Sequence, residues 1–535
     1  MLLHAIIFVS GGAILALELL ASRVMTPYFG VSLYIWTGIL SITLVALALG
    51  YAAGGRLAAH LSAGDRAVAR LTRSFALMPA IAAFGIVAAC LAYPFLFSPF
   101  AKWGLVGGAF LAAIVLLFVP LVAASAMNPL LVAIFVERGK KNVAADAGAG
   151  HVFFVSTLGS VVGVVATAFV LIPYLTNFAA LLVVAIVLAV LSLAAAIFTP
   201  RQVTGRVTVG LIAGVAGLIA GALLAGADSY TGRQGPHAHG GVRWRVEAVQ
   251  SSLFGTVKVL RTEAPAGSRF LRTYFHDGLT QNTVDSDNRS VSFYTYALEA
   301  LGRAYQPQMH GALVLGLGAG MVPMRLAELG VPVEVVDIDP VAPRIARQYF
   351  GFRPDKAVVH QADARTFVER CSGNYDLAIV DLFQGDGTPD YLVTREFFAA
   401  LRSCLAKGGV AVFNTFADVT KPERYAHFLV TLRTELPHFV MYRPKSPSVH
   451  VNSFIVASAE PLRPPARVTF DYLPDQHQQA MWDMLSAPTP LTPTHFTGGQ
   501  IVTDARNPAA HDFAQTQIAY RKSVVETTPP AMLLN

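Results

Sequence analysis

The chain has 535 residues, of which 54% are hydrophobic and only 14% are charged. Soluble globular proteins average about 25% charged residues, so this composition excludes an ordinary soluble protein and indicates a membrane protein. The net charge of +7 is not gathered in a dense basic run in the second half, which favours loops that face anionic lipid over nucleic-acid binding.

Apolar stretches occupy most of the first 226 residues. Each approaches or reaches the roughly 20 residues that cross a bilayer. They cover residues 4–22, 35–53, 76–97, 104–126, 151–173, 178–198 and 207–226. We therefore predict a transmembrane domain of about seven helices over residues 1–226. No basic residue precedes the first stretch, which disfavours a cleavable signal peptide.

Basic residues concentrate in alternate loops of this domain. One side carries Arg56, Arg66, Arg70, Arg73, Arg138, Lys140, Lys141, Arg201 and Arg206, and the other carries only Arg23 and Lys102. The richer side is expected to be cytoplasmic, so an odd number of spans places the second half outside the cytoplasm, in a protein of the inner or cell membrane.

Residues 227–241 break every periodicity and are predicted to form a linker. The linker contains His237 and His239, but a stable metal site needs three or four ligands, so no metal is expected. Residues 242–310 then alternate apolar and polar side chains in short runs between turn residues. This pattern predicts a small β-domain followed by a connecting helix.

A nucleotide-binding α/β unit begins with the apolar strand 313–315, which runs directly into glycines at 316, 318 and 320. Glycine lets a backbone turn tightly and approach a ligand closely. The dinucleotide pattern requires a glycine at position 321, where this chain has Met321, so an adenosylmethionine-type site is favoured over NAD.

Acidic residues follow three successive predicted strands of this unit, at Asp337, Asp363 and Asp381. Ligands of an open parallel sheet collect at the carboxyl ends of its strands, so these side chains are expected to line one crevice. Asp337 is suited to ribose hydroxyls, and Asp363 with Ala364 to an adenine amino group. The alternative is that the acids only cap helices, which is the simplest role for the nearby Asp339.

Several motifs resemble the spermidine synthase (polyamine aminopropyltransferase) family, and more closely its branch with a fused multi-span, transporter-like segment. In the membrane part the resemblance includes residues 50–56. In the second half it covers about residues 245–510 and rests on residues 277–281, 336–340, 349–351, 363–365, 375–381, 392–398 and 503–504.

The resemblance implies a role for each matched residue. Asp337 would hold the ribose, Asp363 the adenine, and Asp381 would prepare the attacking amine as a catalytic base. Gln281 would contact the donor from the β-domain. The acceptor-binding stretch of the family corresponds to residues 294–296, which makes Tyr294 and Tyr296 the candidate substrate-binding residues.

Two departures from the family pattern concern charged ligands. Spermidine-forming members carry an Asp in the glycine loop that binds the donor's amine, whereas this chain has Ala319. The acceptor stretch has also lost its His and Glu. Both S-adenosylmethionine and its decarboxylated form therefore remain candidate donors, and a simple diamine is not the obvious acceptor.

Cys371 and Cys404 are expected at the same edge of the sheet, opposite the ligand. They could form a disulfide if the domain faces an oxidising exterior, and would stay thiols in the cytoplasm. An extracytoplasmic domain conflicts with a donor made in the cytoplasm. Either one span is miscounted, or the membrane domain admits the donor, or the outer domain has another role.

The predicted fold class is a multi-pass α-helical membrane domain, then a small β-domain, then a Rossmann-like α/β transferase domain with a seven-stranded sheet over residues 311–460 and a C-terminal extension over 461–535. The predicted function is aminopropyl transfer to an amine. The alternatives are a methyltransferase acting on a lipid or exported acceptor, and a transporter-like protein with a ligand-sensing domain. The expected partners are a small-molecule amine or membrane-associated acceptor and the bilayer, with a homodimer as a candidate assembly.

Overall fold

A computed structural model describes residues 2–31, 33–63, 66–139, 145–198, 205–230, 235–263, 269–382, 389–418, 420–446, 450–469, 473–509 and 520–535. The chain divides into two compact units. The helical unit comprises Met1–His237 and Lys522–Asn535, and the sheet unit comprises Ala238–Arg521.

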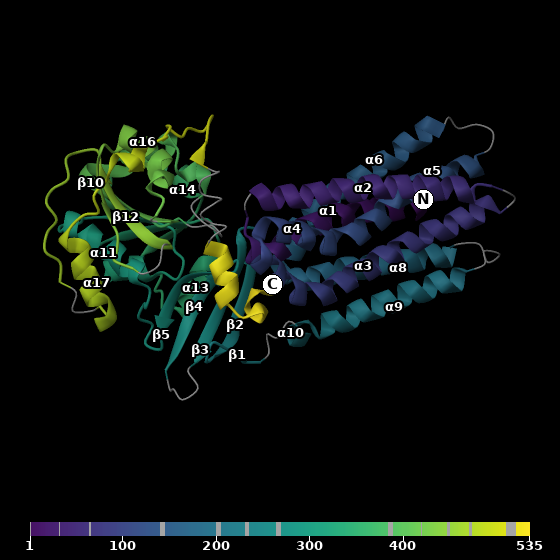
Figure 1. The fold of residues 1–535 in the computed structure, drawn as a ribbon, viewed down its shortest axis with the longest axis horizontal. Coiled ribbons are helices and arrows are strands. Elements are labelled where there is room, and N and C mark those ends of the chain that lie inside the picture. The colour runs from purple at the N-terminus through teal and green to yellow at the C-terminus, as the bar shows by residue number, and fades with distance from the viewer. Residues whose placement is uncertain are drawn as a thin grey trace. The chain divides into compact units, whose positions relative to one another are not determined.

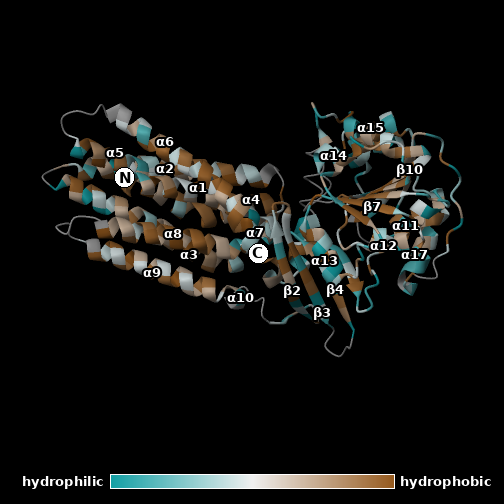
Figure 2. Ribbon diagram, turned by 180° about the vertical axis from the view of Figure 1, so that it is seen from behind, coloured by the Kyte–Doolittle hydropathy of each residue, from teal (hydrophilic) through white to brown (hydrophobic). Residues whose placement is uncertain are grey.

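Long apolar helices form the helical unit (Figure 1). Within the described ranges, seven of them are long and apolar enough to cross a membrane, and Figure 2 shows apolar residues along their length. The unit contains α1 (Leu2–Phe29), α2 (Leu33–Leu61), α3 (Ala67–Trp103), α4 (Leu105–Ala113), the π-helical turn η1 (Ile114–Phe118), α5 (Val119–Arg138), α6 (Ala145–Ala166), the π-helical turn η2 (Thr167–Leu171), α7 (Ile172–Tyr174), α8 (Asn177–Phe198), α9 (Arg206–Ala225), α10 (Ala227–Tyr230) and α19 (Pro530–Leu533).

Small residues let α1 and α6 pack backbone against backbone. A Cβ atom added to Gly163 would lie 2.3 Å from the carbonyl oxygen of Gly12, and one added to Gly159 would lie 1.9 Å from that of Phe8. The hydroxyl of Ser160 also donates to the carbonyl oxygen of Gly11 at 2.9 Å. Such close approach provides dispersion contacts and hydrogen bonds between the two helices.

The sheet unit begins with an antiparallel sheet in the order β1-β2-β3-β4-β5. Its strands are β1 (His237–His239), β2 (Val242–Ser252), β3 (Gly255–Glu263), β4 (Phe270–His276) and β5 (Leu279–Asp285). The alternating pattern predicted these strands. The chain turns from β4 to β5 through Asp277 and Gly278, both at positive φ, which brings Gln281 onto β5.

A mixed sheet follows, with seven strands among the described residues in the order β11-β12-β10-β9-β6-β7-β8. Its strands are β6 (Ala312–Leu315), β7 (Val333–Asp337), β8 (Val358–Gln361), β9 (Tyr375–Val380), β10 (Leu405–Asp418), β11 (His438–Tyr442) and β12 (His450–Ser458). Strands β8, β7, β6, β9 and β10 are parallel, while β12 and β11 pair in antiparallel fashion. The mixed, Rossmann-like sheet agrees with the predicted fold class.

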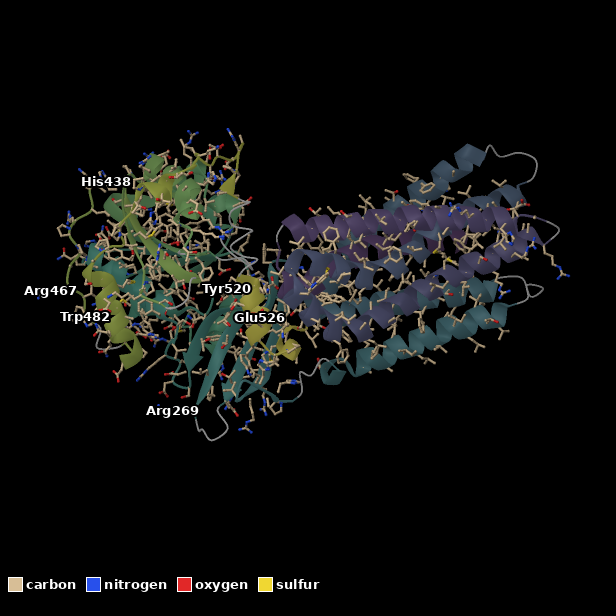
Figure 3. All side chains as sticks on the ribbon, in the orientation of Figure 1. Arg269, His438, Arg467, Trp482, Tyr520 and Glu526 are labelled. Carbon is tan, nitrogen blue, oxygen red and sulfur yellow. A yellow bond between two sulfur atoms is a disulfide. The ribbon has the colours of Figure 1, made fainter. Side chains whose placement is uncertain are left out.

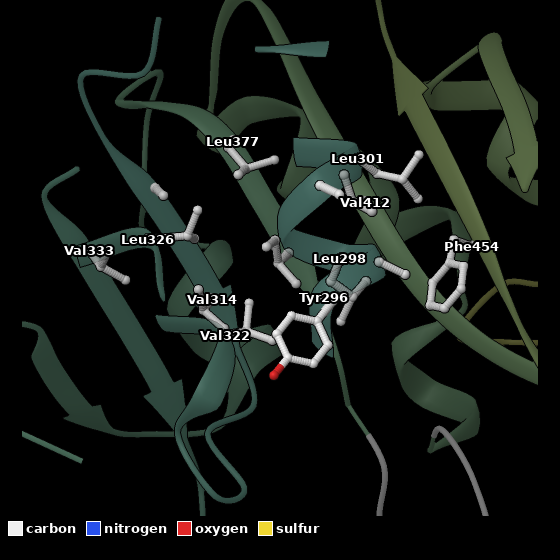
Figure 4. Packing of buried hydrophobic residues seen from close by; sticks show 14 of the residues in the cluster. Tyr296, Leu298, Leu301, Val314, Val322, Leu326, Val333, Leu377, Val412 and Phe454 are labelled. Carbon is white, nitrogen blue, oxygen red and sulfur yellow. The ribbon is translucent and has the colours of Figure 1, made fainter. Parts of the chain in front are cut away.

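Helices and short turns complete the sheet unit. They are α11 (Phe293–Tyr305), α12 (Met321–Glu328), α13 (Val341–Tyr349), α14 (Ala364–Val368), η3 (Asp390–Leu392), α15 (Arg395–Cys404), η4 (Pro422–Tyr425), α16 (Ala426–Glu435), α17 (Asp475–Ser486) and η5 (Pro493–Phe496). One hydrophobic core lies between the mixed sheet and α11, and it includes Tyr296, Leu298 and Phe454 (Figure 4).

The boundaries of the elements differ from the predicted domains in two places. The segment expected to be a linker, 227–241, contains α10 and β1. The expected C-terminal extension is part of both units: Met481 and Met484 of α17 belong to the core of the sheet unit, whereas residues 522–535 group with the helical unit. The apolar residues of 461–535 are scattered among polar ones. Their pattern therefore did not predict that this stretch belongs to either unit.

Cys371 and Cys404 are joined by a disulfide, with their Cα atoms 5.2 Å apart. Cys371 lies shortly before β9, and Cys404 ends α15. Both therefore lie at the edge of the sheet where β9 begins, which confirms the position predicted for them.

The first prediction concerns the contact of α1 with α6. Gly163→Ala should lower the free energy of unfolding by about 1–3 kcal/mol, because the added Cβ overlaps the backbone at Gly12. Gly210→Ala is the matched control, since no atom lies within 4 Å of a Cβ there. Thermal unfolding in detergent measures both, and equal stability of the two variants would contradict the packing role of Gly163.

Candidate active site

The loop after β6 passes close to the end of β9. Gly316 has φ of 96°, and a Cβ atom there would lie 2.2 Å from the carbonyl oxygen of Asp381. A side chain is therefore excluded at Gly316 by both conformation and space. Gly318 also has positive φ but open space around it, and Gly320 precedes α12 and packs against Phe352.

Asp337 ends β7 and is fixed by two backbone amides. Its Oδ2 accepts from Leu317 N at 2.8 Å, and its Oδ1 accepts from Asp339 N at 2.8 Å. Burial raises the pKa of Asp337, and these two hydrogen bonds oppose that rise. The carboxylate is held in one orientation, with lone pairs left to accept from ligand hydroxyls.

Asp339 and His276 present buried polar atoms near Asp337. Asp339 accepts from Val341 N at 2.9 Å, as in the capping role considered from the sequence. Its second oxygen is buried and has no hydrogen-bond partner within the described part of the chain, and the same holds for Nε2 of His276. Buried polar atoms left unpaired are costly, so both are suited to a polar ligand.

Asp363 accepts hydrogen bonds from the chain itself. Its Oδ1 accepts from Thr366 N at 2.9 Å, which caps α14, and its Oδ2 accepts from the hydroxyl of Tyr391 at 2.9 Å. Arg365 forms a two-pronged ion pair with Asp504 and donates to the carbonyl oxygen of Tyr391. The tail motif at Asp504 therefore holds the segment that carries Tyr391 beside Asp363.

These strand ends enclose a cavity, named here the inner cavity. Its wall includes Gln281, Tyr294, Gly316, Gly318, Asp337, Asp339, Asp363, Ala364 and Asp381. Most residues predicted to bind the donor thus lie together. Gly320 does not line this cavity, because it sits one turn further along, where α12 begins.

Asp381 is partly buried at the end of β9. Burial raises its pKa to about 6, and a hydrogen bond from Asn414 opposes the rise. Asn414 Nδ2 donates to Asp381 Oδ1 at 2.8 Å, and Asn452 Nδ2 donates to Asn414 Oδ1 at 2.9 Å. This chain of amides orients the carboxylate while leaving its other oxygen available to a ligand.

A second cavity, named here the outer cavity, also has Asp381 in its wall. Its volume is about 490 Å³. Three wall residues are shared with the inner cavity, namely Gln281, Tyr294 and Asp381. Tyr294 is close enough to Asp381 for the carboxylate charge to help raise the pKa of its hydroxyl, after burial as the main cause.

Tyr296 is apart from both cavities. Its hydroxyl donates to the carbonyl oxygen of Ser290 at 2.7 Å, and its ring belongs to the core between α11 and the mixed sheet. Tyr294 and Tyr296 are two residues apart on a helix and therefore point in different directions. Of the two residues predicted to bind a substrate, Tyr294 lines both cavities and Tyr296 lines neither.

Sequence reasoning missed Tyr391, Asn414 and Asn452. Asn414 had a usable signal, since it follows the apolar run 410–413 as the acids follow their strands. Asn452 lies on the antiparallel strand β12, opposite Phe416 of β10. The rule that ligands bind at the carboxyl ends of parallel strands does not apply to this strand.

Comparison with known proteins assigns this region to a family. Residues 291–460 match the spermine/spermidine synthase domain. The matched region is called the synthase domain below. The synthase domain includes β6 to β12, α11, Tyr294 and Asp381.

Similar proteins include polyamine aminopropyltransferases. The chain is 34% identical to that of Vibrio vulnificus over 179 residues, covering 32% of this chain and 58% of the relative. It is 29% identical to that of Mycobacterium tuberculosis over 326 residues, covering 57% and 59%. An N-terminal histidine N-methyltransferase of Emericella nidulans is 37% identical over 114 residues, 20% of each chain. The chain thus spans less than two thirds of the length of these relatives.

Among solved structures, a probable spermidine synthase from Corynebacterium glutamicum aligns with a TM-score of 0.38 at 17% identity. The alignment covers 51% of this chain and 97% of that one.

The second prediction concerns Asp337. If the inner cavity is the adenosyl site expected from the sequence, Asp337→Ala should weaken binding of methylthioadenosine by about 1.5–3 kcal/mol, because hydrogen bonds to two ribose hydroxyls are lost. Calorimetry measures the affinity, and thermal unfolding identifies variants that do not fold. Asp355→Ala, at an exposed site before β8, is the control. Unchanged affinity in folded Asp337→Ala would remove this residue from the site.

Proposed function

We propose that this protein is a membrane-anchored aminopropyltransferase that moves the aminopropyl group of a decarboxylated adenosylmethionine donor to an amine. One observation carries the proposal: the partly buried carboxylate of Asp381 forms part of the wall of two adjoining cavities. A donor in the inner cavity and an acceptor in the outer cavity would meet at this group. Sequence similarity to polyamine aminopropyltransferases supports the same assignment.

The charge of the inner cavity favours the decarboxylated donor. Four carboxylates, Asp337, Asp339, Asp363 and Asp381, line it, and its described wall contains no Lys or Arg. The sulfonium and ammonium of the decarboxylated donor are both attracted to such a wall. Intact adenosylmethionine would bring its own carboxylate among these acids without a cationic partner, which like-charge repulsion opposes.

Asp381 would act as the base for the transfer. An ammonium has no lone pair, so the acceptor must lose a proton before it attacks. The neutral nitrogen then forms a bond to the aminopropyl carbon next to the sulfonium. The carbon–sulfur bond breaks, and its electron pair stays on sulfur to give neutral methylthioadenosine. Asp381 takes the proton, and its raised pKa of about 6 improves it as a proton acceptor.

Neighbouring groups would orient the two substrates. Asn414 fixes one oxygen of Asp381, so the other points to the acceptor nitrogen. Tyr294 stays a neutral hydrogen-bond donor, because burial raises the pKa of its hydroxyl. Gln281 lies in both cavity walls and can contact the donor from the β-domain.

Methyl transfer is the second candidate, because the chain also resembles the N-terminal histidine N-methyltransferase. That reaction needs intact adenosylmethionine. Calorimetry with both donors separates the two: aminopropyl transfer predicts tighter binding of the decarboxylated form, and tighter binding of the intact form would favour methyl transfer.

The helical unit is proposed to be an integral membrane domain with the synthase domain on the extracytoplasmic side. The positive loops give this orientation. The Cys371–Cys404 disulfide supports it, because disulfides persist in oxidising compartments. The donor would then have to cross or enter through the membrane.

The third prediction concerns Asp381 and pH. Transfer from the decarboxylated donor should fall about tenfold per pH unit below about pH 6, since protonated Asp381 cannot accept a proton. Asp381→Asn should keep methylthioadenosine binding and lose turnover by about 10²-fold or more. Methylthioadenosine release measured against pH tests both. Normal turnover of Asp381→Asn would exclude the base role.

The fourth prediction concerns the cysteines. In intact cells, Cys371 and Cys404 should resist alkylation until a reductant is added, because an extracytoplasmic domain keeps the disulfide. Mass spectrometry after treatment with a thiol-alkylating reagent measures the alkylation of each cysteine. Complete alkylation without reductant would place the synthase domain in a reducing compartment and overturn the orientation.

A further inference from the structure

The two cavities differ in charge although they share Asp381. The inner cavity has four carboxylates in its wall, whereas Asp381 is the sole carboxylate that the described residues contribute to the outer one. The wall of the outer cavity instead includes Lys445 and His477. A ligand of the outer cavity therefore meets negative charge at one end and positive charge elsewhere.

We propose that the acceptor is a zwitterion, a primary amine linked through a methylene chain to an anionic group, and that Lys445 selects its anionic end. The proposal rests on the proposed transfer at Asp381 and names the substrate class for it. A linear diamine carries a second ammonium in place of the anionic group. The positive charge of Lys445 would repel this ammonium.

Strand order separates the segments that carry the two charges. Asp381 follows β9, and Lys445 lies in the loop after β11. The order β9-β10-β12-β11 separates these strands by three steps. At roughly 4.8 Å per step the strands lie about 14 Å apart, a separation that suits an acceptor with several methylenes between its charged ends.

The wall between the two charges suits such a chain. Phe293 and Phe416 provide apolar surface, and the rings of Phe416 and Tyr520 are 4.6 Å apart. Tyr520 is one of the side chains labelled in Figure 3. Asn452 and Ser446 add neutral polar groups that can hydrogen-bond to a carboxylate.

Asp483 partly neutralises the positive charge of Lys445. Its Oδ2 lies 3.7 Å from Nζ of Lys445, whose side chain is 85% exposed. An exposed pair of this kind is weak and gives way easily to a ligand anion. Removing the Asp483 carboxylate should therefore strengthen binding of an anionic end without touching Asp381.

Matched pairs of amines test the proposal on the full chain in detergent or nanodiscs. The pairs are 4-aminobutanoate with 1,4-diaminobutane, and 6-aminohexanoate with 1,6-diaminohexane. Binding to the methylthioadenosine complex is measured by calorimetry, and transfer by mass spectrometry of the product amine. We expect the wild type to bind the aminoacid of at least one pair about fivefold or more tightly than the diamine. This is the ratio of affinities expected for one partly screened ion pair.

Three variants identify the group responsible. Lys445→Glu should reverse the preference toward the diamine, and Asp483→Asn should increase the preference for the aminoacid. Lys356→Glu makes the same charge change in the loop before β8, away from the outer cavity, and should leave the preference unchanged.

The possible failures are distinguishable. Equal or tighter binding of the diamines by the wild type would overturn the zwitterion proposal, whether or not transfer occurs. A preference that Lys445→Glu does not alter would overturn the role of Lys445. Selective binding of an aminoacid without any aminopropyl product would instead contradict the proposed reaction and leave the ligand class standing.

Discussion

The partial burial of one carboxylate, Asp381, at the end of β9 is the constraint on which the site depends. Removing a carboxylate from water raises its pKa, and here Asn414 compensates only in part. The result is a carboxyl group with a pKa of about 6 and one oxygen that does not bind Asn414. Its position requires Gly316 next to it, because any side chain at residue 316 would collide with the Asp381 backbone.

The other acids of the inner cavity are held before any ligand arrives. Asp337 accepts from two backbone amides, and Asp363 accepts from the first turn of α14 and from Tyr391. The helix-capping and ligand-binding interpretations of these acids are therefore compatible, since a carboxylate has lone pairs for both. Capping keeps the oxygens in place, and preorganisation of this kind reduces the entropy lost on binding.

Glycine serves a different purpose in each unit. In the sheet unit, Gly316 allows a conformation and a close approach beside Asp381. In the helical unit, Gly12, Gly159 and Gly163 remove side chains so that α1 and α6 touch through their backbones. The first use follows from a loop that passes the end of β9, and the second from two helices that pack at close range.

Local patterns in the sequence determined the apolar helices, the strand run from β6 to β9 and the acids at the ends of β7 and β9, because these depend on hydrophobic periodicity and on residues adjacent in the chain. The same reasoning could not separate Tyr294 from Tyr296, since helix phase decides which of them faces a cavity. It also could not bring Asn452, Lys445 and Tyr391 to the site. Those residues arrive through the antiparallel return of β12 and β11 and through the ion pair of Arg365 with Asp504, contacts between segments far apart in the chain that only the tertiary structure creates.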